Sequence, residues 1–142
     1  MVHALREAQR VLTPSGVLID VRPVIAPIVV EVVIATRAAW TKTVDTYSAP
    51  EDIAAADSAV QHAVSREWLV FETSLPFEFE IYCDSAGELR AYAEGRKLRG
   101  AEIPYDELEE RRRWLDAQKP KARLRCRRPW MLSTHRKKTW LP

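Results

Sequence analysis

The stretch that decides the fold covers residues 13–21, Thr13-Pro14-Ser15-Gly16 followed by Val17-Leu18-Ile19-Asp20-Val21. The first four residues form a turn, because proline removes a backbone donor and disfavours helix at the residue before it, and glycine permits a positive φ angle. The next five are almost continuously apolar, which is typical of a strand covered on both faces, as in parallel sheets. Residues 2–12, before the turn, have apolar side chains at helical spacing and predict a helix.

Three further helices follow from their starting signals. Ser48 and Glu51 have capping-box spacing, and so do Ser85 and Glu88. We expect the first of these helices to extend to about residue 66 and to bury a stripe of Ile53, Ala56, Val60 and Val64, with His62 on its surface. Pro104 suits the first turn of a helix that reaches about Gln118, and the Glu107–Arg111 and Glu109–Arg113 spacings add favourable pairs to it.

The remaining segments predict strands. A buried strand is expected at 28–35, a third at about 40–47 after a hairpin over residues 36–39, a fourth at 68–82 interrupted at Pro76, and a last one at about 121–136. Together the elements predict an α+β fold: one mixed, mainly antiparallel sheet with about four packed helices. At 142 residues the chain is long enough for a single domain over residues 1–142.

The composition excludes several classes of protein. The longest apolar stretch, residues 24–35, is broken by Pro27 and Glu31 and is shorter than the roughly 20 residues of a membrane-spanning helix, so we expect no membrane partner. Cys83 and Cys126 are too few for a disulfide framework, and we expect buried, free thiols in a cytoplasmic protein. His3, His62 and His135 are isolated in sequence, and no cysteine pair has CxxC spacing, so no metal site is expected.

Charge is distributed unevenly along the chain. Residues 121–142 carry eight basic and no acidic side chains, which leaves 14 basic and 20 acidic residues, a net charge of −6, in residues 1–120. In the last strand Arg123, Arg125 and Arg127 alternate with apolar residues, and we expect them to face Glu78 and Glu80 in a cross-strand ladder worth roughly 0.2–1 kcal/mol for each pair. The alternative is a basic surface over residues 121–138 that binds single-stranded nucleic acid with the help of Trp130 and Trp140.

Residues 3–20 resemble class I S-adenosylmethionine-dependent methyltransferases. Glu7, Ala8, Arg10, Val11, Leu12, Pro14 and Gly16 match the family's "E-A-x-R-V-L-x-P-x-G" helix end, with Ser15 in place of the more usual glycine. Residues 83–92, Cys-Asp-Ser-Ala-Gly-Glu-Leu-Arg-Ala-Tyr, are similar to a "y-D-s-x-e-E-L-x-x-Y" stretch of some bacterial members. The resemblance implies the C-terminal half of that fold, with the last strand inserted between the strand at Val17 and the strand at 77–82.

The resemblance also implies that the cofactor site is missing. In the family the methyl donor lies on a glycine-rich turn, but Gly16, Gly87, Gly95 and Gly100 form no G-x-G here. We therefore expect no cofactor and no catalytic residues, and a methyltransferase-like remnant that acts as a binding or protein-interaction domain. Two alternatives are a methyltransferase subunit completed by another chain and the nucleic-acid binder described above.

The partner expected from this reasoning is a second copy of the chain. Without its usual parallel neighbour, the apolar strand at Val17 has an unpaired edge, and such edges pair with other chains. We expect a homodimer or a higher oligomer. A small molecule or another protein is a further possible partner, and nucleic acid is the least favoured one.

Overall fold

The structure is a computed structural model that describes residues 1–118 and 121–138, the side chains of residues 47, 48 and 99 excepted. Over these residues the chain is an α+β protein with four helices, a five-stranded sheet and a separate two-stranded sheet. It divides into two compact units: unit 1 comprises residues 1–24, 50–77 and 130–142, and unit 2 comprises residues 25–49 and 78–129.

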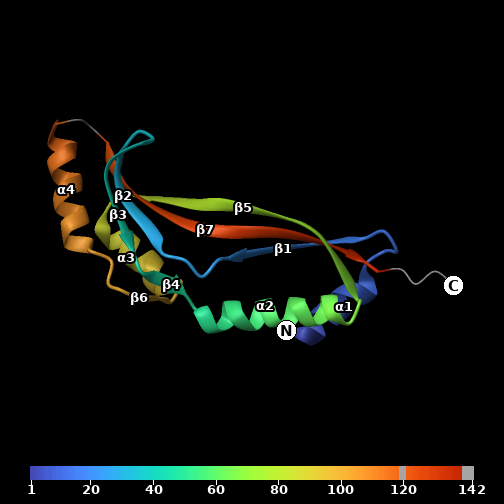
Figure 1. The fold of residues 1–142 in the computed structure, drawn as a ribbon. Coiled ribbons are helices and arrows are strands. Elements are labelled where there is room, and N and C mark those ends of the chain that lie inside the picture. The colour runs from blue at the N-terminus through green and yellow to red at the C-terminus, as the bar shows by residue number, and fades with distance from the viewer. Residues whose placement is uncertain (119–120, 139–142) are drawn as a thin grey trace. The chain divides into compact units, whose positions relative to one another are not determined.

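Unit 1 contains two helices and three paired strand segments. Helices α1 (Val2–Val11) and α2 (Pro50–Ser65) lie side by side (Figure 1). Strand β1 (Val17–Pro23) pairs antiparallel with the C-terminal part of β7 (Ala122–Lys137), and the N-terminal part of β5 (Leu69–Cys83) also belongs to this unit. An ion pair of 2.6 Å joins Arg22 of β1 to Asp57 of α2, so α2 lies on the face of the sheet to which Arg22 points.

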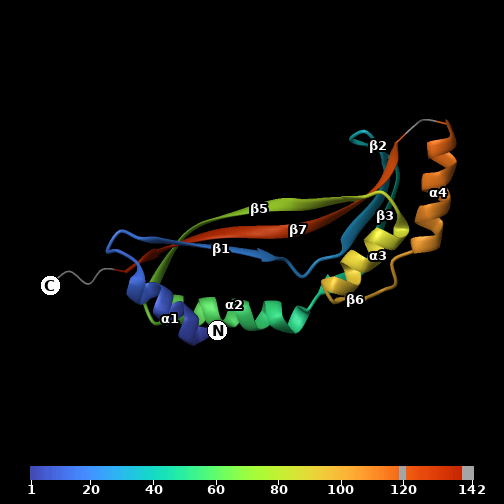
Figure 2. The ribbon, with the colours of Figure 1, turned by 180° about the vertical axis from the view of Figure 1, so that it is seen from behind.

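Unit 2 is built around strand β2. β2 (Ile28–Ile34) pairs antiparallel with β3 (Arg37–Val44) on one side and with residues 122–127 of β7 on the other. Helices α3 (Ala86–Gly95) and α4 (Tyr105–Gln118) pack against each other (Figure 2). Strands β4 (Thr46–Ser48) and β6 (Leu98–Gly100) form the two-stranded sheet.

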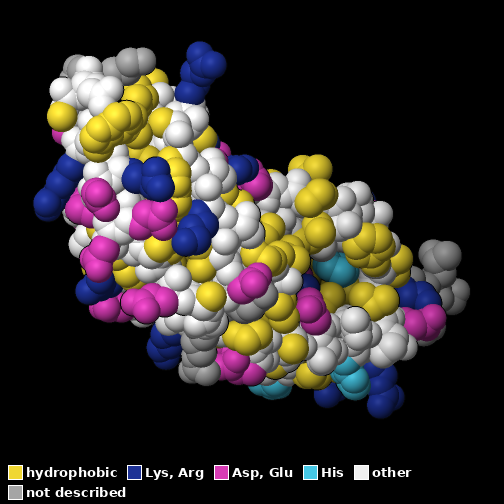
Figure 3. All heavy atoms as spheres, turned by 60° about the vertical axis from the view of Figure 1, so that its left-hand side comes forward, with side chains coloured by type: hydrophobic (Ala, Val, Ile, Leu, Met, Phe, Trp, Pro, Cys, Tyr) yellow, Lys and Arg dark blue, Asp and Glu magenta, His cyan; other side chains and the backbone are white. Residues whose placement is uncertain are grey.

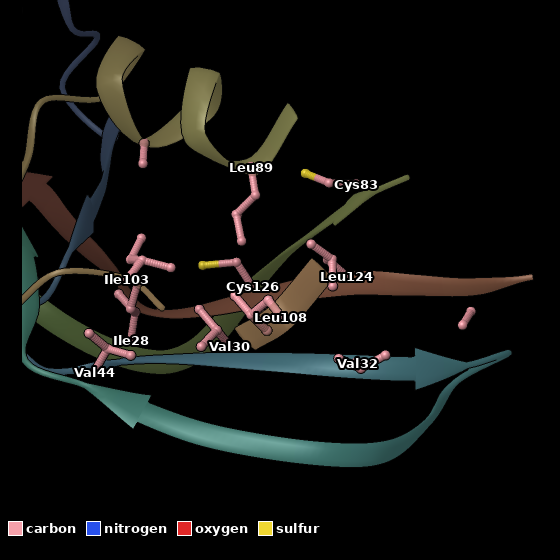
Figure 4. Packing of buried hydrophobic residues seen from close by; sticks show 12 residues of the cluster. Ile28, Val30, Val32, Val44, Cys83, Leu89, Ile103, Leu108, Leu124 and Cys126 are labelled. Carbon is pink, nitrogen blue, oxygen red and sulfur yellow. The ribbon is translucent and has the colours of Figure 1, made fainter. Parts of the chain in front are cut away.

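The hydrophobic core of unit 2 follows from two sequence patterns. The apolar run of β2 supplies Val30 and Val32, and the alternation of β7 supplies Leu124 and Cys126, all completely or almost completely buried. Leu89 points from α3 toward Cys126, and Leu108 of α4 joins the same cluster (Figure 4). The arginines that alternate with the apolar residues of β7 point to the opposite face of the sheet.

Most of the predicted elements are confirmed. α1, α3, α4, β2 and β7 lie within a few residues of their predicted bounds. The Ser85 side chain accepts a hydrogen bond from the backbone N–H of Glu88 at 3.2 Å and caps α3. Strand β7 pairs with both β1 and β5, as expected. The predicted cap at Ser48 lies outside the described side chains.

The environment expected for residues 17–21 is wrong. β1 is antiparallel to its neighbour, and Val17, Ile19 and Val21 are exposed, Ile19 by 61%. An apolar strand is buried on both faces only where other elements cover both. In unit 1 the helices lie on the face to which Arg22 points, so the face with Val17, Ile19 and Val21 stays exposed.

Three smaller expectations are also corrected. β5 continues through Pro76 without interruption, because β7 is its only strand partner in the described part of the chain and an edge strand tolerates proline. The hairpin turn is tighter than expected, at residues 35–36, and the predicted strand at 40–47 is divided into β3 and β4. In α2 the buried stripe contains Ala59 and Ala63 in place of Val60 and Val64.

We predict that Leu124→Ala lowers the free energy of unfolding by about 2–5 kcal/mol, because it removes a completely buried side chain and leaves a cavity in the core. Leu75→Ala is the matched control, since Leu75 is 62% exposed, and it should change stability by less than about 0.5 kcal/mol. Urea titration followed by circular dichroism measures both. Equal losses in the two variants would contradict this core assignment.

Candidate interaction surface

The predicted ladder residues lie on one face of unit 2. Arg127 Nη1 is 2.6 Å from Glu78 Oε2, and Arg125 Nη1 is 3.6 Å from Glu80 Oε1. From Glu78 to Glu80 the partner on β7 changes from Arg127 to Arg125, so β5 and β7 run antiparallel. The structure therefore brings together Arg125, Arg127, Glu78 and Glu80, whereas Arg123 pairs elsewhere.

Glu31 is the centre of this cluster and was not among the predicted site residues. Its side chain lies between two guanidinium groups: Arg125 Nε is 2.5 Å and Arg127 Nε is 3.2 Å from Glu31 Oε2. Glu31 as a whole is only 2% exposed. In the sequence Glu31 is a single acidic residue within an apolar strand, and it was interpreted only as a break in the apolar run.

The charges in this cluster neutralise one another. Burial alone would lower the pKa of Arg125, but its hydrogen bonds to Glu31 and Tyr82 and the nearby carboxylates raise the pKa above the ordinary value. The pKa of Arg127 is raised by its hydrogen bond to Glu78, against burial, with Glu31 adding to the rise. Both arginines therefore stay charged. A buried carboxylate is tolerated in a protein when it is paired in this way.

The rest of the basic segment is also paired. Arg123 lies 2.6 Å from Asp84, Arg136 lies 2.5 Å from Glu72, and Lys138 lies 2.7 Å from Glu67. Lys137 donates to the backbone carbonyl of Leu12 at 2.7 Å. Trp140, invoked for base stacking, lies outside the described residues. In the described part of the segment, acidic residues of β2 and β5 and of the segments that flank β5 absorb much of the positive charge.

A cavity of about 650 Å³ in unit 2 is lined by charged groups that already bind one another. Within its wall, Asp116 accepts the backbone N–H groups of Lys121 and Ala122 at 2.9 and 3.1 Å. Arg112, another wall residue, lies 2.7 Å from Glu109. The hydrogen bond from Arg112 holds the pKa of Glu109 down at about 2, against desolvation. These groups stabilise the end of α4 and the start of β7.

Neither the two thiols nor the other described metal-ligating residues are arranged for nucleophilic or metal chemistry. Desolvation raises the pKa of both thiols, that of Cys126 to about 12, so neither sulfur is a thiolate near neutral pH. Among the described residues, no group of histidine, cysteine and acidic side chains is arranged to hold a metal ion.

His135 is the unusual titratable group of unit 1. It is 3% exposed, and neither of its ring nitrogens has a hydrogen-bond partner among the described residues. Its ring meets Phe71 edge-on, with the centroids 5.7 Å apart, and Leu18 is its cross-strand neighbour. Desolvation lowers the pKa of His135, and Arg22 adds to this effect while Asp20 opposes it. The imidazole is therefore held in its neutral form.

Exposed apolar side chains are concentrated in unit 1. Ten of the thirteen large hydrophobic residues exposed in the described part of the chain belong to this unit, and three belong to unit 2. The ten are Met1, Val2, Val11, Val17, Ile19, Val21, Val24, Val70, Phe71 and Leu75. Figure 3 shows hydrophobic side chains reaching the surface in clusters between the charged ones. Where such residues are contiguous, an exposed apolar surface marks a site of interaction with other macromolecules.

The three outward-facing side chains of β1 form a continuous surface with β7. Val17, Ile19 and Val21 point to the same face of the strand, and Val21 lies opposite Leu132 in the antiparallel register. Pro23 lies opposite Trp130 at the end of this row. We call the row of Val17, Ile19, Val21 and Leu132 the β1 surface. It is the candidate functional site of the chain.

Comparisons of the chain with protein-family models, with curated proteins and with solved structures find no match. The resemblance of residues 3–20 and 83–92 to methyltransferases therefore stays a prediction. Separately, none of the helices in the described ranges has the length and the apolar character needed to cross a membrane.

We predict that Glu31→Ala lowers the free energy of unfolding by about 3–5 kcal/mol, because it leaves two partly buried guanidinium groups without their shared partner. Glu80→Ala serves as the control: its side chain is more exposed and its ion pair is longer, so the loss should be below about 1 kcal/mol. Chemical denaturation at neutral pH measures both losses. A Glu31 variant as stable as the Glu80 variant would show that the cluster contributes little.

A second prediction concerns the dependence of stability on pH. The pKa of His135 is lower in the folded chain than in the unfolded chain, so the unfolded chain binds the extra proton first. The stability should be unaffected by this group above the ordinary histidine pKa of about 6.5 and should fall as the pH drops below it. In His135→Leu the loss of stability between pH 7 and pH 5 should be shallower than in the wild-type protein, because the imidazole that binds its proton more readily in the unfolded chain is gone. Denaturant titrations at several pH values measure the two slopes, and identical slopes would contradict the prediction.

Proposed function

We propose that this chain is a non-catalytic protein-interaction domain that self-associates through the apolar surface of unit 1. The observation that carries the proposal is the concentration of exposed large apolar side chains in that unit. We propose the cytoplasm as its compartment, because both thiols are unpaired and a reducing environment keeps them so.

The core of unit 1 supports this proposal. Its buried apolar residues are Ile53, Ala56, Ala59, Ala63 and Leu69, of which three are alanines. Larger apolar side chains of the same unit remain in contact with water instead. Full burial of a valine or isoleucine side chain contributes roughly 1.5–3 kcal/mol, so a partner that covers these residues gains free energy that the unit does not gain within itself.

The charge distribution weighs against a nucleic-acid partner. Binding to a polyanion requires lysine and arginine side chains that are free to contact phosphates, whereas Arg123, Arg127 and Arg136 each lie within 2.6 Å of a carboxylate oxygen. Polyanion contacts would have to displace these pairs. The apolar surface is not compensated in this way, and for that reason we favour a protein partner.

Ile19→Lys tests the proposal. The wild-type protein should behave as a dimer or a higher oligomer in light scattering at tens of micromolar. The variant should raise the dissociation constant about tenfold, because it removes the half-exposed isoleucine from both copies at about 1 kcal/mol each, and a factor of ten requires about 1.4 kcal/mol. Trp114→Lys is the matched control, because Trp114 is 63% exposed, close to the 61% of Ile19, but belongs to unit 2. It should leave the mass unchanged.

Two results would contradict the proposal. One is a wild-type protein that stays monomeric at these concentrations. The other is an oligomer that Trp114→Lys disrupts and Ile19→Lys does not. Circular dichroism spectra should be nearly the same for both variants and the wild type, because both residues are exposed and the fold is retained.

A further inference from the structure

We infer that two copies of this chain join edge to edge through β1, in an antiparallel pairing with a two-fold axis at Ile19. The inference rests on the proposed function, which it makes specific: it names the strand, the register and the partner. The occupant of the β1 edge is β1 of a second copy, and the two sheets continue into each other.

The outer edge of β1 has no strand partner among the described residues, because β1 pairs with β7 alone. The backbone N–H of Lys137 donates to the carbonyl of Gly16 at 3.0 Å, and these two residues face each other in the ladder. Hydrogen-bonded pairs recur at every second residue of an antiparallel ladder, so Leu18, Asp20 and Arg22 bond to β7. The N–H and C=O groups of Val17, Ile19 and Val21 therefore point outward.

These outward groups determine which registers can form. With the axis at Ile19, Val17 faces Val21 of the other copy and Ile19 faces its own equivalent. Each of these pairs exchanges two hydrogen bonds, and all three outward residues take part. The same pairing brings the exposed apolar side chains together on one face of the joined sheet, where directly opposite side chains interact.

The neighbouring registers are less favourable. An axis at Asp20 places the two Asp20 carboxylates directly opposite each other, which is destabilising. An axis at Val21 places Ile19 opposite Pro23, which has no N–H to donate. An axis at Leu18 leaves Val21 opposite Ser15, outside the strand. The axis at Ile19 avoids all three defects, and its charged residues Asp20 and Arg22 face Leu18 and Gly16.

The other free edges carry the features that prevent edge-to-edge association. β5 contains Pro76 and the acidic residues Glu72, Glu78 and Glu80, and β3 contains Arg37 and Lys42 and lies beside a bulge at Val32 and Val33 of β2. Charges, proline and bulges are the usual protection of edge strands. On β1 the only charged side chains are Asp20 and Arg22. Arg22 donates to the Asp20 carboxylate at 2.7 Å and also to the Asp57 carboxylate of α2.

The apolar surface available at the β1 edge is that of a small interface. Val17, Ile19 and Val21 are each about half exposed. Edge pairing covers the side of each of these side chains that faces the partner strand, which involves six side chains in the dimer. A standard interface buries roughly 800 Å² on each partner. The half-buried Leu132 and Trp130 extend the surface along β7. We expect a dimer that dissociates on dilution.

Disulfide trapping tests the register. Paired Cα atoms in a hydrogen-bonded antiparallel pair are about 5.5 Å apart, within the roughly 4.4–6.8 Å that a disulfide spans. Ile19→Cys should therefore form a covalent dimer under mild oxidation. Val17→Cys alone and Val21→Cys alone should not, because equivalent residues four positions apart in register are separated by roughly 13 Å. A mixture of Val17→Cys and Val21→Cys should cross-link, and the wild-type protein, whose thiols are buried, is the blank.

The outcomes distinguish the register, the edge pairing and the self-association from one another. Cross-linking of Ile19→Cys and of the mixture alone supports the pairing. Cross-linking of Val21→Cys by itself overturns the register. A wild-type oligomer in light scattering without cross-linking of Ile19→Cys overturns the inference and leaves the proposed function standing, whereas a wild-type monomer overturns both.

Discussion

The carboxylate of Glu31, held between Arg125 and Arg127, is the interaction on which unit 2 depends. Glu31 and Arg125 are direct cross-strand neighbours, so the ion pair and the ladder select the same register. A slip of one residue would turn the carboxylate into the core and bring Val30 and Val32 to the charged face. Such a slip costs both the burial of two valines and the desolvation of an unpaired charge. The buried acid therefore gives this sheet one well-defined register, with α3 and α4 covering its apolar side.

Unit 1 has a thinner core in its described residues. Its helix α2 presents alanines to the interior, and small side chains allow close approach but bury little apolar area. His135 occupies an interior position in this unit with both ring nitrogens unpartnered, which favours the neutral imidazole and adds little to packing. The large apolar side chains that would thicken this core are instead at the surface of β1 and β5. Among the large apolar side chains, more are thus exposed than buried in unit 1 and more are buried than exposed in unit 2, although the described part of each unit consists of two helices and several strands.

Much of this fold could be predicted from local patterns, and the errors have a common physical origin. The cap at Ser85, the helix start at Pro104 and the alternation of Arg123, Arg125 and Arg127 depend on neighbours within a few residues, and these expectations agree with the structure. The burial of residues 17–21 depends on which elements lie over them, and that information is not local. The role of Glu31 was missed for the same reason: its partners are more than ninety residues away. Pro76 was interpreted as a break because its position on an edge strand was not evident from periodicity.

The exposure of β1 and the pairing of the basic residues are connected. The excess of basic residues after residue 120 suggested a surface for an anionic partner, but the acidic excess of the preceding residues neutralises it across β2, β5 and β7. The apolar side chains of β1 have no such compensation. The sequence of this strand is typical of complete burial, but the strand lies at a sheet edge. The N–H and C=O groups on its outer side are not paired with any described strand. At this edge the valine and isoleucine side chains of β1 are exposed to water, which is unfavourable for apolar groups. In the proposed dimer, pairing with an identical strand bonds the outward backbone groups and covers part of the exposed side chains, since the same three residues carry both. The composition of β1 thus agrees with the proposed dimer, in which this strand is interior to the joined sheet, whereas it is an edge strand in the single chain.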